Sequence, residues 1–300
     1  MITTIIPAYG KPELLQSSIR SVQSQTYSDW ELIVVDDNDP ETEERKQTEK
    51  MLSDFASKDS RIHYVRHPRN LNGAAARNTG IRQAQGEYIA FLDSDDEYYP
   101  QRFQECLNAL QNAPNEIAGV YTGCEFRRNG KTFRIVKNVE AGNFLVETLA
   151  CTFMFCTGSN LFMKASAIRN LQGFDESFLR HQDYEFLVRY FEKYVLAAVP
   201  EVLVIKNNEN INVPNVKKMI QIKKQYLQKY KTIITGLPSD KRDYIYRSQY
   251  IQIAEAAQRT AADNIALDYY NRAQALKRLT CKEQARRLAF YILSHGKGIR

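Results

Sequence analysis

The chain has 300 residues, of which 43% are hydrophobic and 25% are charged, as is typical of a folded globular protein. Its net charge of +6 favours anionic partners, namely phosphates, anionic lipid or nucleic acid, without choosing among them. Five cysteines without a C-x-x-C pair and only four histidines argue against a disulfide framework and a zinc site. No apolar run approaches the roughly 18 residues of a membrane span. The start, MITTIIPAYG, lacks the features of a signal peptide, so we expect a cytoplasmic protein.

The first hundred residues alternate between two hydrophobic periods. Short apolar runs that are typical of strands occupy residues 2–6, 30–35, 61–65 and 88–92, and helical spacing occupies 13–25, 41–56 and 74–84. This alternation predicts a parallel sheet with helices on both faces. Ligands of such sheets bind beyond the carboxyl ends of the strands. We therefore expect the polar residues that follow these strands to lie in one crevice.

The middle of the chain is more mixed. Residues 119–126 and 132–136 predict a hairpin around the turn Asn129-Gly130. A further strand is expected at 158–163 and an amphipathic helix at 183–194. The last apolar run, 195–205, contains Pro200, which predicts an edge strand or two short pieces.

A polar, turn-rich segment at 206–215 predicts a linker between a first domain, 1–205, and a helical region, 216–300. Helices are expected there at 216–232, 239–262, 264–279 and 282–293. Basic residues recur along this region: Lys217, Lys218, Lys223, Lys224, Lys277, Arg278, Lys282, Arg286, Arg287, Lys297 and Arg300. A basic amphipathic helix can lie on an anionic membrane, and the alternatives are a solvated helical cap or a homodimer face. No aromatic residues are interleaved at readable spacing, so nucleic acid is not an expected partner.

The strand at 88–92 ends in a cluster of carboxylates, Asp93, Asp95, Asp96 and Glu97. Burying like charges together requires a cation, and oxygen ligands suit Mg²⁺ or Mn²⁺. The alternative is a solvated acidic turn that caps a helix starting near Pro100. An apolar strand followed by Asp-x-Asp is also the nucleophile motif of haloacid-dehalogenase-like phosphatases, with Asp93 as the nucleophile. No later Lys and Gly-Asp pair completes that site.

Several segments together resemble the family 2 glycosyltransferases of the GT-A fold. They are TTIIPAYGKPELLQSSIRSVQSQTYSDWELIVVDD, NLNGAAARNTGI, GEYIAFLDSDDEYYP, GFDESF and QDYEFLVR, and they cover about residues 2–205. The resemblance implies a Rossmann-like, mixed but mainly parallel sheet with flanking helices, followed here by the C-terminal helical region. It implies an inverting, metal-dependent enzyme that moves a sugar from a nucleotide-sugar donor, most often a UDP-sugar. The acceptor it implies is a hydroxyl of a glycan or of a lipid-linked saccharide in cell-surface polysaccharide synthesis.

The resemblance also assigns roles to single residues. In relatives, the positions of Pro7, Ala8 and Tyr9 surround the nucleoside base, and that of Asp37 accepts a hydrogen bond from the base edge. The positions of Asp93 and Ser94 meet the nucleotide sugar, and that of Asp95 ligates Mn²⁺ or Mg²⁺. Arg77 matches the arginine of the ARN segment, which implies contact with the diphosphate or pairing with the acidic cluster.

Asp183 matches the general base that takes a proton from the acceptor hydroxyl, and the alternative for it is a helix N-cap. Gln182 departs from the family, which often has Glu there, and Gly10 stands where Asn is common. A third hypothesis is a helical interaction protein that carries a degenerate transferase domain. The intact set Asp37, Asp93, Asp95 and Asp183 argues against it.

Overall fold

The computed structural model describes residues 1–156, 158–207, 215–260, 262–281, 283–285 and 288. The chain forms two compact units, the first made of residues 1–143 and 154–211 and the second of residues 144–153 and 212–300. Each unit has its own hydrophobic core. Within the described part of the chain, no helix is both long enough and apolar enough to cross a membrane.

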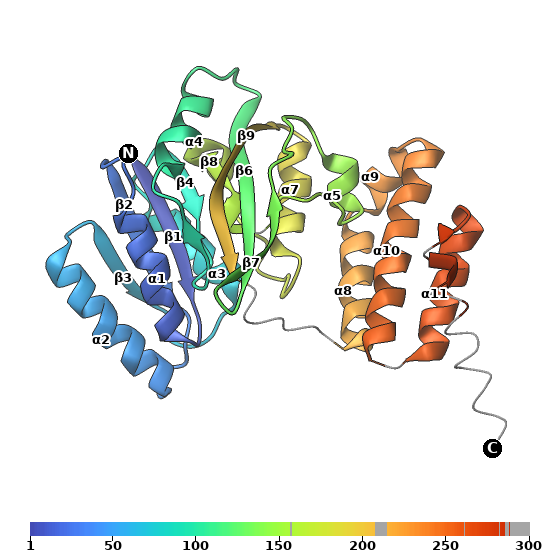
Figure 1. The fold of residues 1–300 in the computed structure, drawn as a ribbon, viewed down its shortest axis with the longest axis horizontal. Helices are drawn as coiled ribbons and strands as arrows, with labels where there is room; N and C mark the ends of the chain where they lie inside the picture. The colour runs from blue at the N-terminus through green and yellow to red at the C-terminus, as the bar shows by residue number, and fades with distance from the viewer. Residues whose placement is uncertain (157, 208–214, 261, 282, 286–287, 289–300) are drawn as a thin grey trace. The chain divides into compact units, whose positions relative to one another are not determined.

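The first unit is built on one mixed sheet (Figure 1). Its strands are β1 (Ile2–Ala8), β2 (Trp30–Asp36), β3 (Ile62–Arg66), β4 (Tyr88–Phe91), β5 (Glu97–Tyr98), β6 (Ile117–Arg128), β7 (Lys131–Val136), β8 (Phe162–Lys164) and β9 (Val195–Asn207). Their order is β3-β2-β1-β4-β8-β6-β9-β5, and β7 pairs with β6. Strands β1 to β4 run parallel, as does β9 beside β6, whereas β8, β7 and β5 pair antiparallel. The expected mixed, mainly parallel sheet is therefore confirmed.

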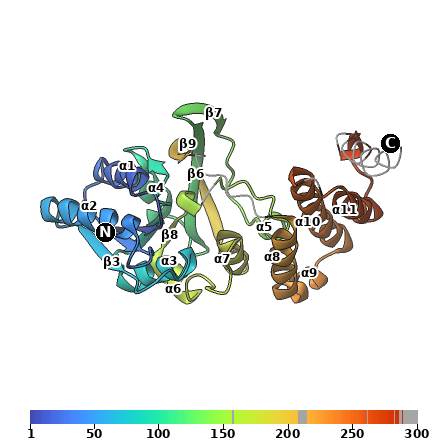
Figure 2. The same ribbon diagram turned by 90° about the horizontal axis from the view of Figure 1, so that it is seen from below.

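Helices cover both faces of this sheet (Figure 2). They are α1 (Pro12–Gln23), α2 (Glu43–Lys58), α3 (Gly73–Gln83), α4 (Arg102–Gln111), α6 (Ala165–Asn170) and α7 (Gln182–Phe191), with a 3₁₀ turn, η1, at Gly158–Asn160. Leu15, Ile19 and Val22 of α1 recur at helical spacing and share a buried core with α2 and α4. Alternate residues of β1 point to the opposite face. There Ile5 packs on Gly80 of α3, so closely that a Cβ at position 80 would lie 2.5 Å from Ile5 Cγ2.

Two expectations for the middle of the chain need correction. The strand predicted at 158–163 is half wrong, because residues 158–160 form the turn η1 and β8 begins only at Phe162. The run around Pro200 is one strand, β9, with β6 on one side and β5 on the other. The register with β6 jumps from Val199 to Val202, so Pro200 sits in a bulge where no ladder N–H is needed. The hairpin around Asn129-Gly130 is confirmed, with both turn residues at positive φ.

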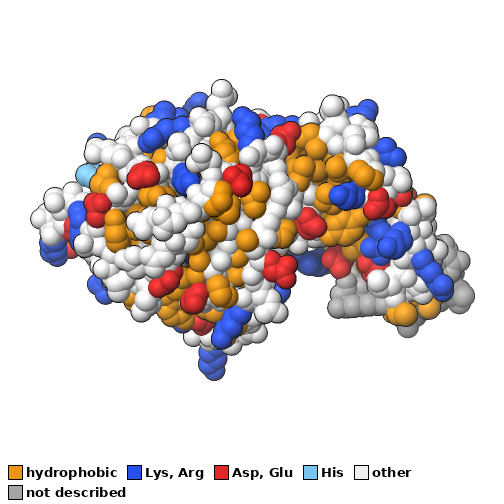
Figure 3. All heavy atoms as spheres, turned by 90° about the horizontal axis from the view of Figure 1, so that it is seen from above, with side chains coloured by type: hydrophobic (Ala, Val, Ile, Leu, Met, Phe, Trp, Pro, Cys, Tyr) orange, Lys and Arg blue, Asp and Glu red, His pale blue; other side chains and the backbone are white. Residues whose placement is uncertain are grey.

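The second unit is helical. Its helices are α5 (Leu145–Leu149), α8 (Val216–Lys229), α9 (Lys231–Gly236), α10 (Ser239–Arg259) and α11 (Asp263–Leu276). The predicted helix 282–293 lies mostly outside the described residues, and the predicted linker 206–215 begins inside β9 and then also falls mostly outside them. On the face in Figure 3, the Lys and Arg side chains of this unit are interspersed with acidic and apolar ones.

Short α5 is held by side chains of α8 and α10. The Tyr226 hydroxyl donates to the Thr148 carbonyl at 2.9 Å. The Gln249 and Gln252 amides donate to the carbonyls of Leu149 and Ala150 at 2.7 and 2.9 Å. Carbonyls at a helix end lack partners within the helix, so these contacts satisfy them.

Candidate active site

Three strand ends meet at one edge of the sheet. Ala8 at the end of β1 is in register with Asp36 of β2, and Ile5 is in register with Phe91 of β4. The segments after β1, β2 and β4 therefore leave the sheet at the same edge, as their parallel direction predicts. Pro7 and Ala8 are the last two residues of β1, and the Tyr9 side chain beyond them is 65% exposed. An exposed aromatic ring at this edge is available to a ligand.

Asp36 has a structural role. Its buried carboxylate accepts from the Asn38 backbone and side-chain amides at 3.0 and 2.8 Å and from the Tyr64 hydroxyl at 2.7 Å. Arg45 lies 3.6 Å from it. These bonds fix the turn that follows β2.

Asp37 is tied to the loop before α3. Its carboxylate accepts from the backbone N–H groups of Leu71 and Asn72 at 2.8 and 2.9 Å, and it lies 2.7 Å from His67 Nδ1. Asp37 and His67 are both buried, with exposed fractions of 2% and 7%. The carboxylate therefore shapes the loop over the strand ends, and its contact with a base stays a prediction. His67 was not identified from the sequence, because a single histidine after a strand matches no motif.

The acidic cluster forms as the sequence predicts. Asp93, Asp95 and Asp96 each offer an oxygen, and these oxygens lie within 4.8 Å of one another. Asp96 is fully buried, whereas Asp93, Ser94 and Asp95 are half-buried on the turn after β4. An all-oxygen donor set of this size fits a hard divalent cation. Burial raises the pKa of Asp95, and the charges of Lys206 and Lys11 oppose that shift.

A lysine enters this cluster from a distant strand. Lys206 Nζ, near the end of β9, lies 3.3 Å from Asp96 Oδ2 and 3.8 Å from Asp93 Oδ2. Asp96 also accepts from the Ser159 hydroxyl at 2.6 Å and the Asn207 N–H at 3.1 Å. Burial raises the pKa of Asp96 to about 7, although Lys206 opposes the shift. Burial alone would lower the pKa of Lys206, but Asp96 and Asp93 raise it, so the ammonium stays charged. No sequence motif marked this residue.

Arg77 of α3 links the cluster to the other side of the site. Its guanidinium donates to Asp93 Oδ1 at 2.7 Å and to Gln182 Oε1 at 3.0 Å. It also lies 5.5 Å from the centre of the Phe174 ring. Burial disfavours its charge, but Asp93 and Asp183 more than compensate and raise the pKa of Arg77. The pairing of Arg77 with the acidic cluster is therefore confirmed, and its contact with a diphosphate stays a prediction.

Asp183 is the second residue of α7, and His181 occupies the N-cap position. The N-cap alternative for Asp183 is therefore wrong. Among the described residues Asp183 Oδ1 is buried without a hydrogen-bond partner. A Cβ at Gly158 would lie 2.8 Å from this oxygen, so the absence of a side chain there makes room for the carboxylate. Burial raises the pKa of Asp183, an effect that Arg77 offsets and Asp93 reinforces. A buried carboxylate oxygen with an open acceptor position suits a general base.

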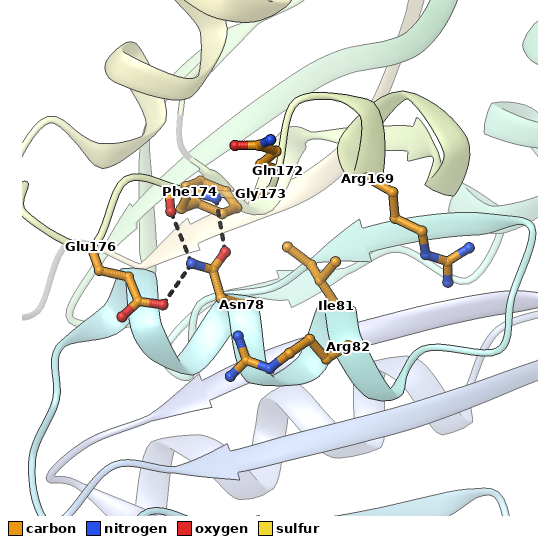
Figure 4. Close-up of a pocket in the computed structure, with 8 residues that line it drawn as sticks. All are labelled: Asn78, Ile81, Arg82, Arg169, Gln172, Gly173, Phe174 and Glu176. Carbon is orange, nitrogen blue, oxygen red and sulfur yellow. Dashed lines mark hydrogen bonds between the residues drawn. The ribbon is translucent and has the colours of Figure 1, made fainter.

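The neighbouring parts of α7 and the turn before it have structural roles. Arg189 pairs with Glu185 at 2.7 Å and donates to the Gly173 carbonyl at 2.8 Å. Asn78 of α3 bonds the Phe174 N–H and carbonyl and the Glu176 carboxylate, which holds this turn against α3 (Figure 4). A surface hollow of about 580 Å³ lies there, lined by Asn78, Ile81, Arg82, Arg169, Gln172, Gly173, Phe174 and Glu176. None of the acidic cluster lines it.

Similarity to known proteins agrees with this geometry. Residues 3–171 match the family model described as glycosyl transferase family 2. An uncharacterized glycosyltransferase of Methanocaldococcus jannaschii is 28% identical over 78% of this chain and 79% of its own length. The amylovoran biosynthesis glycosyltransferase AmsB of Erwinia amylovora is 29% identical over 66% of this chain and 67% of its own.

Two solved structures resemble the fold at low sequence identity. The mannosyltransferase PcManGT from Pyrobaculum calidifontis, in complex with GDP-Man and Mn²⁺, has a TM-score of 0.59 at 18% identity and covers 98% of this chain and 80% of its own. TarS 1–349 of S. aureus, in complex with UDP, has a TM-score of 0.57 at 13% identity, and the match covers 98% of this chain and 91% of the TarS chain.

The sheet and its flanking helices define an α/β fold of the GT-A type, with an acidic cluster at the end of β4. Because the family match spans more than half of the chain, the protein belongs to glycosyl transferase family 2 and is a glycosyltransferase. The phosphatase hypothesis and the degenerate-domain hypothesis are therefore set aside.

Proposed function

We propose that the protein is an inverting, divalent-metal-dependent glycosyltransferase of cell-surface polysaccharide synthesis. Its donor is a nucleotide sugar, a UDP-sugar, and its acceptor is a hydroxyl of a glycan or lipid-linked saccharide. The observation that carries the proposal is the buried, unpartnered Oδ1 of Asp183, near the charge network of Asp93 and Arg77. The similarity to AmsB and the UDP bound by TarS support the acceptor class and the donor class respectively.

The chemistry requires one base and a stabilised leaving group. Asp183 takes the proton of the acceptor hydroxyl, and the acceptor oxygen attacks the anomeric carbon from the face opposite the leaving group. The bond from that carbon to the diphosphate oxygen breaks, and its electron pair stays on the diphosphate. Because the attack comes from the face opposite the leaving group, the configuration inverts. Because one bond forms as the other breaks, no covalent intermediate is needed.

The cluster on the β4 turn holds the donor side. Asp95, with Asp93 and Asp96 beside it, would hold Mn²⁺ or Mg²⁺, which would neutralise charge on the departing diphosphate. Arg77 keeps Asp93 in place through its 2.7 Å contact. Pro7, Tyr9 and Ser94 lie at the same edge and are available to the nucleoside and the sugar, whereas the Ala8 side chain is buried.

The test is a thermal-shift panel of UDP, GDP, CDP and dTDP, each with Mn²⁺ or with EDTA. One nucleotide should raise the melting temperature more strongly with Mn²⁺ than with EDTA. The identity of that nucleotide gives the donor class. The matching radiolabelled nucleotide sugar and a lipid-linked acceptor then report transfer. A chain that binds none of the four nucleotides in either condition contradicts the proposal.

We further propose that the enzyme works in the cytoplasm, in contact with the inner face of the membrane through the basic C-terminal helices. Lys217, Lys218 and Lys224 of α8 are exposed, but Lys223 is buried and donates to Gln252 Oε1 at 2.6 Å, so it adds no surface charge. Co-sedimentation of the full chain with anionic vesicles tests this. Changing the three exposed lysines to Glu should weaken binding, whereas the same change at Lys46, Lys50 and Lys58 of α2 should not. Equal binding by both triple variants contradicts the proposal.

A further inference from the structure

The charge of the acidic cluster is already balanced in part by the protein itself. The Arg77 guanidinium forms an ion pair with Asp93 Oδ1 at 2.7 Å. Lys206 faces the other oxygen of Asp93 at 3.8 Å and Asp96 Oδ2 at 3.3 Å. Like-charged carboxylates that lie this close and partly buried need such neutralisation.

The sheet fixes the position of Lys206. Strand β5 follows the acidic turn directly, and Glu97 of β5 is in register with Ile205 of β9. Asn207 then donates its backbone N–H to Asp96 Oδ1 at 3.1 Å and its side-chain amide to the Asp95 carbonyl at 2.9 Å. The residue between Ile205 and Asn207 is thereby held at the carboxylates. The Lys206 side chain is 22% exposed, so its position is not that of a freely solvated surface lysine.

We propose that the Lys206 ammonium is a built-in cation of the donor site, and that it competes with the divalent metal for Asp93 and Asp96. It also neutralises part of the charge of the nucleoside diphosphate, as the metal does. The second half of this proposal rests on the proposed function, because it names the diphosphate as the anion. The first half concerns only the carboxylates and a metal ion.

The reason for competition is that both cations need the same oxygens. A metal ion that binds Asp96 Oδ2 must displace or repel an ammonium 3.3 Å from it. Removing the ammonium leaves a buried carboxylate without its cation, which costs stability and favours a metal ion in its place. Lys206→Met should therefore bind Mn²⁺ more tightly than the wild type, whereas Lys206→Arg, which keeps the charge, should not.

The first experiment is a calorimetric Mn²⁺ titration of the full chain without nucleotide. We expect about tenfold tighter Mn²⁺ binding by Lys206→Met, and wild-type affinity for Lys131→Met, a control at an exposed lysine that begins β7. Melting temperatures with EDTA and with Mn²⁺ accompany it, and Mn²⁺ should stabilise Lys206→Met more than the wild type. Should Lys206→Met not fold in EDTA, Lys206→Gln replaces it. Equal Mn²⁺ affinity of the wild type and the charge-removing variant overturns the competition.

The second experiment measures UDP binding in EDTA. The wild type should still bind UDP measurably, and the UDP affinity of Lys206→Met should be about tenfold lower. Added Mn²⁺ should make the two UDP affinities similar. Equal UDP affinity of both proteins in EDTA overturns the role of Lys206 toward the diphosphate. A wild type that binds no nucleoside diphosphate at all contradicts the proposed function and this role together, and the Mn²⁺ titration still decides whether Lys206 competes with metal.

Discussion

The carboxylate of Asp183 is the group on which turnover should depend most. Its Oδ1 lacks a partner among the described residues, and burial raises the pKa of the carboxyl group. The carboxylate is therefore a stronger base toward an acceptor hydroxyl. Asp183→Asn keeps the shape but cannot take a proton. We expect turnover to fall by about 10²- to 10⁴-fold.

Nucleotide binding is the control for Asp183→Asn, because the residue is assigned to the acceptor side. The affinity for UDP should stay within about threefold of the wild type. Full turnover by Asp183→Asn with bound donor would show that another group is the base.

Asp59 gives a pH dependence that can be measured at one residue. It accepts two hydrogen bonds from the Arg61 guanidinium at 2.9 Å, and this pairing lowers its pKa from 3.8 to about 2. Because the folded pKa is the lower one, the stabilisation is present above pH 4 and is lost as the pH falls toward 2. Asp59→Asn should therefore lower the free energy of unfolding at pH 7 by about 1 kcal/mol, after allowance for the partly exposed Arg61.

Urea unfolding between pH 7 and pH 3 checks this, and the difference between wild type and Asp59→Asn should shrink as the pH falls. The control is Asp54→Asn, which breaks an exposed ion pair with Lys58 and should change little. A difference that grows toward acid pH would contradict the assignment.

At the scale of elements, the contact between α3 and β1 depends on a glycine. A Cβ at Gly80 would lie 2.5 Å from Ile5 Cγ2, closer than side chains approach. Gly80→Ala should therefore destabilise the fold by about 1–3 kcal/mol, although Ala favours a helix. Thermal unfolding measures the cost. Gly236→Ala is the control, because a Cβ there meets nothing within 4 Å, and an equal loss in both variants would refute the close-packing argument.

The elements were predictable where the hydrophobic period is clear. Strands β1 to β4 and helices α1 to α3 differ from their predicted bounds by about two residues, because Ile2, Ile6, Leu15 and Ile19 mark their periods. The 3₁₀ turn at 158–160 was not predictable, since a short run of mixed residues has no period of its own. The bulge at Pro200 requires knowledge of β6, which contributes the other side of the register jump.

The site was predictable only in its contiguous motifs. Asp93, Asp95 and Asp96 follow a strand, so local sequence brings them together. Lys206 reaches them only through the pairing of β9 with β5, a contact between segments about a hundred residues apart. The burial of Lys223 likewise depends on Gln252 of another helix. Long-range pairing is what periodicity cannot supply.

At the scale of the whole molecule, two separate cores predict two unfolding transitions. The strand ends that would bind a nucleotide all belong to the first unit. Saturating UDP with Mn²⁺, at about 100 times its dissociation constant, should stabilise that unit by about 2.7 kcal/mol. In differential scanning calorimetry, one transition should therefore move up by about 5–10 °C while the other stays in place. Equal shifts of both transitions would contradict this.

The placement of α5 has a consequence for chimeras between relatives. Residues 144–153 belong to the second unit, yet they lie inside the 3–171 segment that matches the family. Replacing only the C-terminal region with that of another enzyme would remove Tyr226, Gln249 and Gln252. Two carbonyls of α5 and that of its C-cap residue would then lose their donors. A recombinant that keeps both parts intact therefore has to exchange two stretches of the gene, one of them in the middle of the transferase sequence.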